Sequence, residues 1–103
     1  MIVYNKLVRD KIPQIIADAN KEFKTHIVDR EEAVRYLLDK FDEEIEEFKE
    51  AYAKEELADI LELVHGLAYQ LNYDLEEIEA IRAQKYENRG GFEARIILDH
   101  VLE

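Results

Sequence analysis

The sequence predicts an all-α fold, a bundle of four helices with a central antiparallel helix hairpin. Apolar residues recur with the 3.6-residue period of a helix over residues 30–71. Capping-box-like patterns open two of the helical segments, and the glycine pair Gly90 and Gly91 follows the last one. The length fits a single domain over residues 1–103, with a core small enough that oligomerisation would complete it.

The two ends of the chain lack the long helical patterns of its centre. A short first helix is expected, with Asp10 as its N-cap and Pro13 in its first turn, where proline loses no hydrogen bond. Residues 23–28 are rich in β-branched side chains and are typical of a linker or a short strand. Alternating apolar residues over 92–98 favour a strand or an extended arm. One short strand pair near the termini is compatible with both patterns.

The central hairpin follows from two long amphipathic segments. The first is opened by Asp29 with Glu32 three residues later, and its apolar positions continue to about Tyr52. The second covers about Ala53 to Leu71. The connection between them is short, and short connections join antiparallel neighbours.

Charge and composition exclude several classes of protein. The net charge of −11 argues against binding to a nucleic-acid polymer, which requires clustered Lys and Arg. There is no cysteine, so disulfides and thiolate metal sites are excluded. No apolar run approaches the roughly 18 residues of a membrane span, and the first residues do not resemble a signal peptide. We therefore expect a cytoplasmic protein with no membrane partner.

Most of the negative charge lies on the predicted hairpin. Residues 42–62 hold ten carboxylates against two lysines, whereas residues 1–24 and 80–95 are mildly basic. A helix advances by about 100° per residue, so each acid can be placed relative to the apolar face. Four acids border that face and four others point to solvent. The bordering acids are Glu44, Glu47, Glu56 and Asp59, and the solvent-facing ones are Glu43, Glu46, Glu55 and Glu62.

The two bordering pairs are displaced from their apolar faces in the same rotational sense. In an antiparallel hairpin, Glu44 and Glu47 would therefore converge with Glu56 and Asp59. Four carboxylates at the edge of a core repel one another and resist desolvation. A hard divalent cation, Mg²⁺ or alternatively Mn²⁺, relieves this conflict. The competing interpretation is a solvated acidic face, which is common on helices.

The acidic segments resemble a known signature. EEIEE followed by EELAD matches the E-E-x-x-E … E-x-x-D pattern of the all-α nucleoside triphosphate pyrophosphatases, a superfamily that includes MazG-like proteins and phosphoribosyl-ATP pyrophosphohydrolase. The opening YNKLVRDKIP and the later KYENRGGF look like a small subgroup of phosphoribosyl-ATP pyrophosphohydrolase-like proteins. The resemblance extends over nearly the whole length, because these segments are spread between Tyr4 and Phe92.

The resemblance implies a Mg²⁺-dependent hydrolase that cleaves a nucleotide between its α and β phosphorus atoms and releases pyrophosphate. The positions that match the family's metal ligands are Glu44, Glu47, Glu56 and Asp59. By the same analogy, Glu47 is our candidate for activating the attacking water. The short gap between Glu47 and Glu56 leaves little room for an inserted specificity loop, so the substrate does not transfer from the family.

Phosphate chemistry also needs positive charge besides the metal. The fourth expected helix, opened by Asp74 with Glu77, carries Lys85 and Arg89 near its end. These two residues are candidates for substrate binding, although basic residues also neutralise the C-terminus of a helix.

A second basic group lies near the start of the chain. Lys6, Arg9 and Lys11 are either surface charge or further ligands of the substrate phosphates, and we select Lys6 and Arg9 as substrate-binding candidates. Glu62 and His65 form a Glu-x-x-His pair typical of di-iron bundles, but the chain has no second copy of it.

Two functions are therefore open. The first is a nucleotide pyrophosphohydrolase that acts as a homodimer or homotetramer. The second is a non-catalytic helical dimerisation or regulatory module that senses a divalent cation or a nucleotide.

Overall fold

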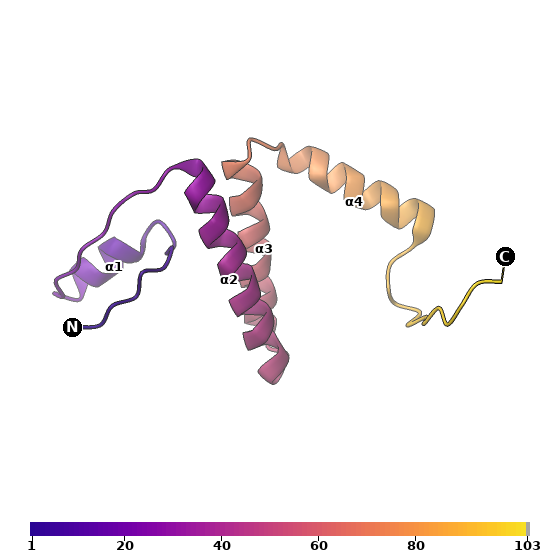
Figure 1. Cartoon of the computed structure of the whole chain (residues 1–103), viewed down its shortest axis with the longest axis horizontal. Coiled ribbons are helices and arrows are strands. Elements are labelled where there is room, and N and C mark those ends of the chain that lie inside the picture. The colour runs from indigo at the N-terminus through magenta and orange to yellow at the C-terminus, as the bar shows by residue number, and fades with distance from the viewer. Residues whose placement is uncertain (103) are drawn as a thin grey trace. The chain divides into compact units, whose positions relative to one another are not determined.

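The computed structural model describes residues 1–102, in which all regular secondary structure is helical. Four helices lie in this range, as Figure 1 shows: α1, Ile12–Asp18; α2, Arg30–Ala51; α3, Lys54–Gln70; and α4, Leu75–Arg89. The all-α prediction is confirmed. The chain divides into two compact units, residues 1–73 with α1 to α3 and the part from Asp74 onwards with α4. The assignment of residues 1–103 to a single domain stays a prediction.

Helix α2 begins and ends for identifiable local reasons. The Asp29 carboxylate accepts a hydrogen bond of 2.8 Å from the backbone N–H of Glu32, which confirms the predicted N-cap. At the other end, Tyr52 takes the left-handed conformation with φ 52°, which stops the helix. Helix α3 follows after Ala53, so two residues join the helices.

Helices α2 and α3 lie side by side and run in opposite directions (Figure 1). The first residue of α2, Arg30, donates hydrogen bonds to the backbone oxygen of Tyr69 at 3.0 Å and to Asn72 Oδ1 at 2.8 Å. Its guanidinium also lies 5.1 Å from the centre of the Tyr69 ring. Arg30 thereby caps the end of α3 and holds it beside the start of α2.

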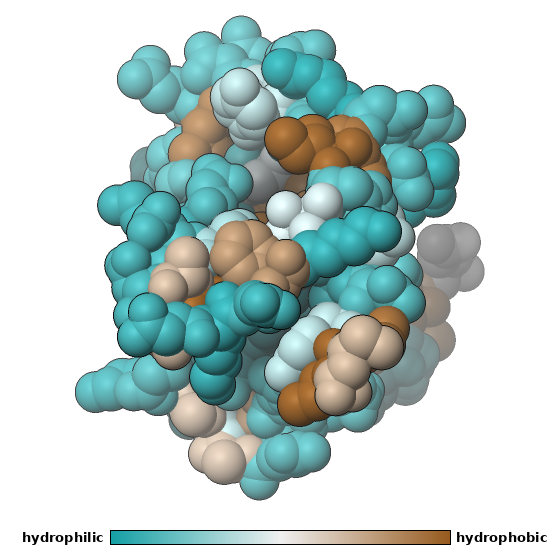
Figure 2. Space-filling model, turned by 90° about the vertical axis from the view of Figure 1, so that its left-hand side faces the viewer, coloured by the Kyte–Doolittle hydropathy of each residue, from teal (hydrophilic) through white to brown (hydrophobic). Residues whose placement is uncertain are grey.

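The core between α2 and α3 is small. Its buried hydrophobic side chains are Ala33, Leu37, Leu63 and Ala68. Gly66 lets the helices approach closely, because a Cβ at this position would lie 3.2 Å from Leu37 Cδ2. Many larger apolar side chains remain exposed, and on the face drawn in Figure 2 they lie between hydrophilic ones.

Helix α1 differs from its prediction at the N-terminus. The N-cap is Lys11, not Asp10, and no side chain caps the helix. The backbone N–H of Ile12 donates to the Arg9 oxygen at 3.0 Å, so Asp10 lies within a turn. An N-cap aspartate needs an extended backbone one residue before the helix, and this turn removes it.

The short strand pair near the termini is not formed. Residues 23–28 and 92–98 contain no strand, and the tail instead makes a turn in which the Arg95 N–H donates to the Phe92 oxygen at 3.2 Å. The Phe92 and Ile96 side chains are 96% and 82% exposed. Alternating apolar residues make a strand only when a neighbouring strand satisfies the backbone and a surface covers the side chains.

Helix α4 starts and stops close to the predicted positions. The Asp74 carboxylate accepts from the N–H of Glu76 at 2.9 Å, one residue earlier than the Glu77 of the predicted capping box. Gly90, at φ 78°, follows the last helical residue and donates its N–H to the Tyr86 oxygen. Among the helices of residues 1–102, none has the length and apolar composition needed to cross a membrane.

Candidate metal centre

The structure brings three of the four predicted ligands together. One carboxylate oxygen from each of Glu44, Glu56 and Asp59 lies within 4.8 Å of the other two, and all three residues are half-buried. Glu56 and Asp59 are three residues apart on α3 and therefore share a face, while Glu44 is supplied by α2. This spacing suits oxygens that share one cation.

One oxygen of Glu44 has no hydrogen-bond partner. Glu44 Oε2 is buried, and no group in the part of the chain that the structure describes donates to it. Buried carboxylate oxygens normally accept hydrogen bonds, because desolvation without compensation is costly. A cation or a proton would satisfy this atom.

The Glu56 carboxyl titrates abnormally. Its pKa is raised, first by a hydrogen bond with Glu44, then by partial burial, and further by the negative charges of Glu44 and Asp59. A hydrogen bond with Glu47 acts in the opposite direction and lowers this pKa. Glu47 is exposed on α2 and outside the triad, but this contact connects it to the site. The carboxylates thus favour a shared proton, which a bound cation would displace.

The raised pKa of Glu56 predicts a pH-dependent stability. The folded state holds the Glu56 proton more tightly than the unfolded chain, so this stabilisation is fully present below the ordinary pKa of 4.5 and is lost as the pH rises through the raised pKa. We expect Glu56→Gln, which cannot ionise, to melt at a higher temperature than the wild type near neutral pH, with the difference vanishing near about pH 4. Thermal melts followed by circular dichroism without divalent cations measure this.

The control for that comparison is Glu55→Gln, which removes the same charge from an exposed neighbour on α3. If Glu55→Gln raises the melting temperature as much as Glu56→Gln does, only the total negative charge matters and the local interpretation is wrong.

Two basic residues of the N-terminal segment contact the acidic edge of the hairpin, which consists of Glu43, Glu44, Glu56 and Asp59. Arg9 Nη2 donates to Asp59 Oδ1 at 2.8 Å, and Lys6 Nζ donates to Glu43 Oε2 at 3.4 Å. Glu43, which the helical wheel directs to solvent, therefore forms an ion pair with Lys6, and the Glu43 side chain is 42% exposed. No sequence pattern identifies these contacts, because they join residues that are 50 and 37 positions apart.

The other predicted residues lie elsewhere. Lys85 and Arg89 are exposed on α4, in the second unit, and Arg89 is the last residue of that helix. Their part in substrate binding stays a prediction. Glu62 and His65 are exposed on α3 and do not belong to the acidic triad.

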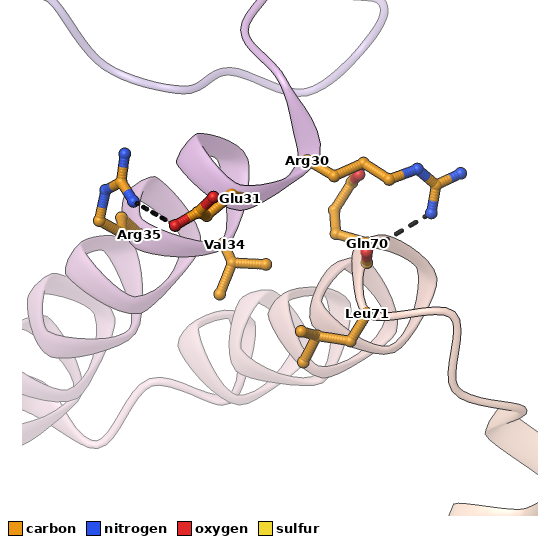
Figure 3. Close-up of a pocket in the computed structure, with 6 residues that line it drawn as sticks. All are labelled: Arg30, Glu31, Val34, Arg35, Gln70 and Leu71. Atoms are coloured by element: carbon orange, nitrogen blue, oxygen red, sulfur yellow. Dashed lines mark hydrogen bonds and ion pairs between the residues drawn. The ribbon is translucent and has the colours of Figure 1, made fainter.

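A separate pocket of about 360 Å³ lies at the end of the hairpin where α2 begins (Figure 3). Arg35 and Glu31 form an ion pair of 3.5 Å on one side of it. Arg30 and Leu71 also line it. At 1.5 Å per residue, Glu44 is roughly 20 Å further along α2 than Arg30, so the pocket and the triad are distinct features.

Comparisons with protein-family models, with curated proteins and with solved structures found no match for the chain. The likeness of EEIEE and EELAD to the pyrophosphatase signature therefore stays a prediction about the family. The function has to be inferred from the residues and contacts of the site.

Proposed function

We propose that the protein is a Mg²⁺-dependent nucleotide pyrophosphohydrolase of the all-α nucleoside triphosphate pyrophosphatase superfamily. Its substrate would be a nucleoside triphosphate or a phosphoribosyl nucleotide, cleaved between the α and β phosphates to release pyrophosphate. The observation that carries the proposal is the convergence of Glu44, Glu56 and Asp59, together with the buried Glu44 oxygen that accepts no hydrogen bond. A set of carboxylates in a chain without cysteine suits Mg²⁺ or Mn²⁺ rather than a soft metal.

Each carboxylate has a role in this proposal. Glu44, Glu56 and Asp59 would hold the metal, which when bound supplies charge for the phosphate oxygens and a water of lowered pKa. Glu47, exposed and next to Glu56, would accept a proton from the attacking water. The water oxygen forms a bond to the α phosphorus, the bond from that phosphorus to the bridging oxygen breaks, and pyrophosphate leaves.

Basic side chains would bind the polyphosphate. Arg9 and Lys6 are the candidates supported by contacts, because both already lie on the acidic edge of the hairpin. Lys85 and Arg89 are candidates from the sequence alone. Charge-assisted hydrogen bonds from these groups would balance the charge that develops on the phosphoryl oxygens.

Incubation of the purified protein with a panel of nucleotides and Mg²⁺, followed by a pyrophosphate assay, tests the activity. We expect pyrophosphate and the matching monophosphate in equal amounts from at least one triphosphate or phosphoribosyl nucleotide. No turnover of any of them with Mg²⁺ or Mn²⁺ would refute the enzyme.

The second candidate function is the non-catalytic module that senses a cation or a nucleotide. The large share of exposed apolar side chains supports a protein that associates with a partner. A thermal melt separates the possibilities, because a ligand that binds only the folded state must stabilise it. If Mg²⁺ stabilises the protein beyond matched ionic strength and nothing is hydrolysed, the sensor is the better description.

Both functions involve an oligomer, which we propose to be a homodimer or homotetramer that completes the core. On α3, Leu57 and Leu61 are one turn apart and are 47% and 63% exposed. On α2, Leu38 and Ile45 are two turns apart and are 51% and 40% exposed. A second copy that covered these side chains would bury the apolar surface that the small core leaves in water.

Leu61→Glu should weaken that association. A charge placed in a buried interface would raise the dissociation constant by about 30-fold or more, the loss expected at a central contact. Light scattering coupled to size exclusion should give the wild type a multiple of 12.2 kDa and the variant a smaller mass at equal concentration. Ala83→Glu, which adds the same charge to an exposed position of α4, is the control. A monomeric wild type contradicts the proposal.

A further inference from the structure

Asp59 takes part in two arrangements. It contributes an oxygen to the acidic triad, and its Oδ1 accepts a hydrogen bond of 2.8 Å from Arg9 Nη2. The pair is open to solvent, with the two side chains 58% and 43% exposed. A positive group from the N-terminal segment therefore lies against one of the proposed metal ligands.

The N-terminal segment contacts the hairpin through more than this pair with α3. Lys6 contacts Glu43, and residues 4–7 line a pocket of about 170 Å³ together with Tyr36 and Glu43 of α2. The segment is thus anchored beside the site, so loss of the Arg9 contact alone would leave the guanidinium within reach of a ligand there.

A guanidinium and a divalent cation bind the same carboxylate unfavourably, because both are positively charged. Whichever Asp59 oxygen the cation used, two positive charges would lie a few ångströms apart and repel. An exposed ion pair is weak, and a divalent cation on several carboxylates is the stronger partner. The released guanidinium would then need an anion, and a phosphate accepts two parallel hydrogen bonds from an arginine.

We infer that Arg9 and the divalent cation compete for Asp59, and that Arg9 passes from Asp59 to a phosphate of the nucleotide when the cation binds. The inference rests on the proposed function and adds an order of events to it. Arg9 offsets the charge of Asp59 until the cation arrives, and it then adds positive charge where the polyphosphate binds.

Mn²⁺ titration of the full chain and of Arg9→Gln, followed by the electron paramagnetic resonance of free Mn²⁺, tests the competition. Arg9→Gln should bind Mn²⁺ about two- to fivefold more tightly, the range that loss of an exposed ion pair allows. At saturating Mn²⁺, the same variant should bind a non-hydrolysable nucleoside triphosphate at least about tenfold more weakly, because a charge-assisted contact is lost.

Lys11→Gln is the matched control. It removes one positive charge from the same segment, and Lys11 forms no ion pair within residues 1–102. Equal Mn²⁺ affinities of Arg9→Gln and Lys11→Gln overturn the competition, and unchanged triphosphate binding by Arg9→Gln overturns the transfer. If the wild type, Arg9→Gln and Lys11→Gln all fail to bind Mn²⁺, the proposed metal centre is wrong as well. Tighter Mn²⁺ binding and weaker triphosphate binding without hydrolysis of any nucleotide support the inference and refute the enzyme.

Discussion

Glu44→Gln should lower nucleotide hydrolysis by at least about 100-fold, since changes even to residues that only support metal ligands cost about 10- to 100-fold. Glutamine keeps the size of the side chain but removes the negative charge through which a carboxylate attracts Mg²⁺. The same change should leave the melting temperature without divalent cations equal or higher. Glu44 raises the pKa of Glu56 and has a buried oxygen without a donor, so its charge is a local cost to folding. Loss of activity with retained stability is typical of a functional residue.

The matched comparison is Glu46→Gln, which removes the same charge two residues away. Glu46 is exposed and pairs with Lys49 at 3.2 Å, within α2. Its replacement should change activity less than about twofold, because such exposed pairs contribute little. The assignment of Glu44 is wrong if both variants lose activity alike, or if Glu44→Gln unfolds while Glu46→Gln does not.

The helices were predictable because their signals are local. Asp29 and Glu32 lie within one turn, and the hydrogen bond between them requires no residue from elsewhere in the chain. The short link at Tyr52 leaves two amphipathic helices few arrangements other than antiparallel. Asp10 shows the limit of this reasoning, since a turn that begins at Arg9 takes it out of the N-cap position.

The acidic site was partly predictable for the same reason. The angle of a side chain around its helix axis depends on sequence position alone, so the approach of Glu44 to Glu56 and Asp59 follows from two local patterns and one short link. Glu47 is about 60° further round α2 from the apolar face than Glu44, and it is exposed. The helical wheel orders Glu44 and Glu47 by their angle from the apolar face. It does not show how far from that face a carboxylate can lie and still reach the triad.

Contacts between distant segments were not predictable. The pair of Arg9 with Asp59 and the bonds of Arg30 to the end of α3 join residues about 40 to 50 positions apart, and neither has a periodic signature. Arginine is common on surfaces, so its presence does not indicate which oxygens it will contact. These contacts determine how charge is arranged around the acidic site.

Leu37→Ala should be among the most destabilising single changes in the hairpin, by about 2–4 kcal/mol in the free energy of unfolding. Leu37 is the larger of the two buried side chains of α2, and it lies against Gly66, which has no side chain that could fill the space. For a chain of this length the loss corresponds to a melting temperature lower by roughly 10–20 °C. Melts at one fixed protein concentration measure it, because association would also contribute to stability. Leu102→Ala, at a position 88% exposed, should have almost no effect.

Gly66→Ala provides the sharper test, since its effect should differ between the two backgrounds. With Leu37 present, the new methyl group would lie 3.2 Å from Leu37 Cδ2 and force a small displacement. In the Leu37→Ala protein the same methyl group would occupy part of the cavity, while the gain in helix propensity of up to about 1 kcal/mol is common to both backgrounds. Gly66→Ala should therefore be more favourable in the Leu37→Ala background, with a coupling of about 0.5 kcal/mol or more. Additive effects would show that Leu37 and Gly66 do not pack against each other, and the close approach of α2 and α3 would then be wrong.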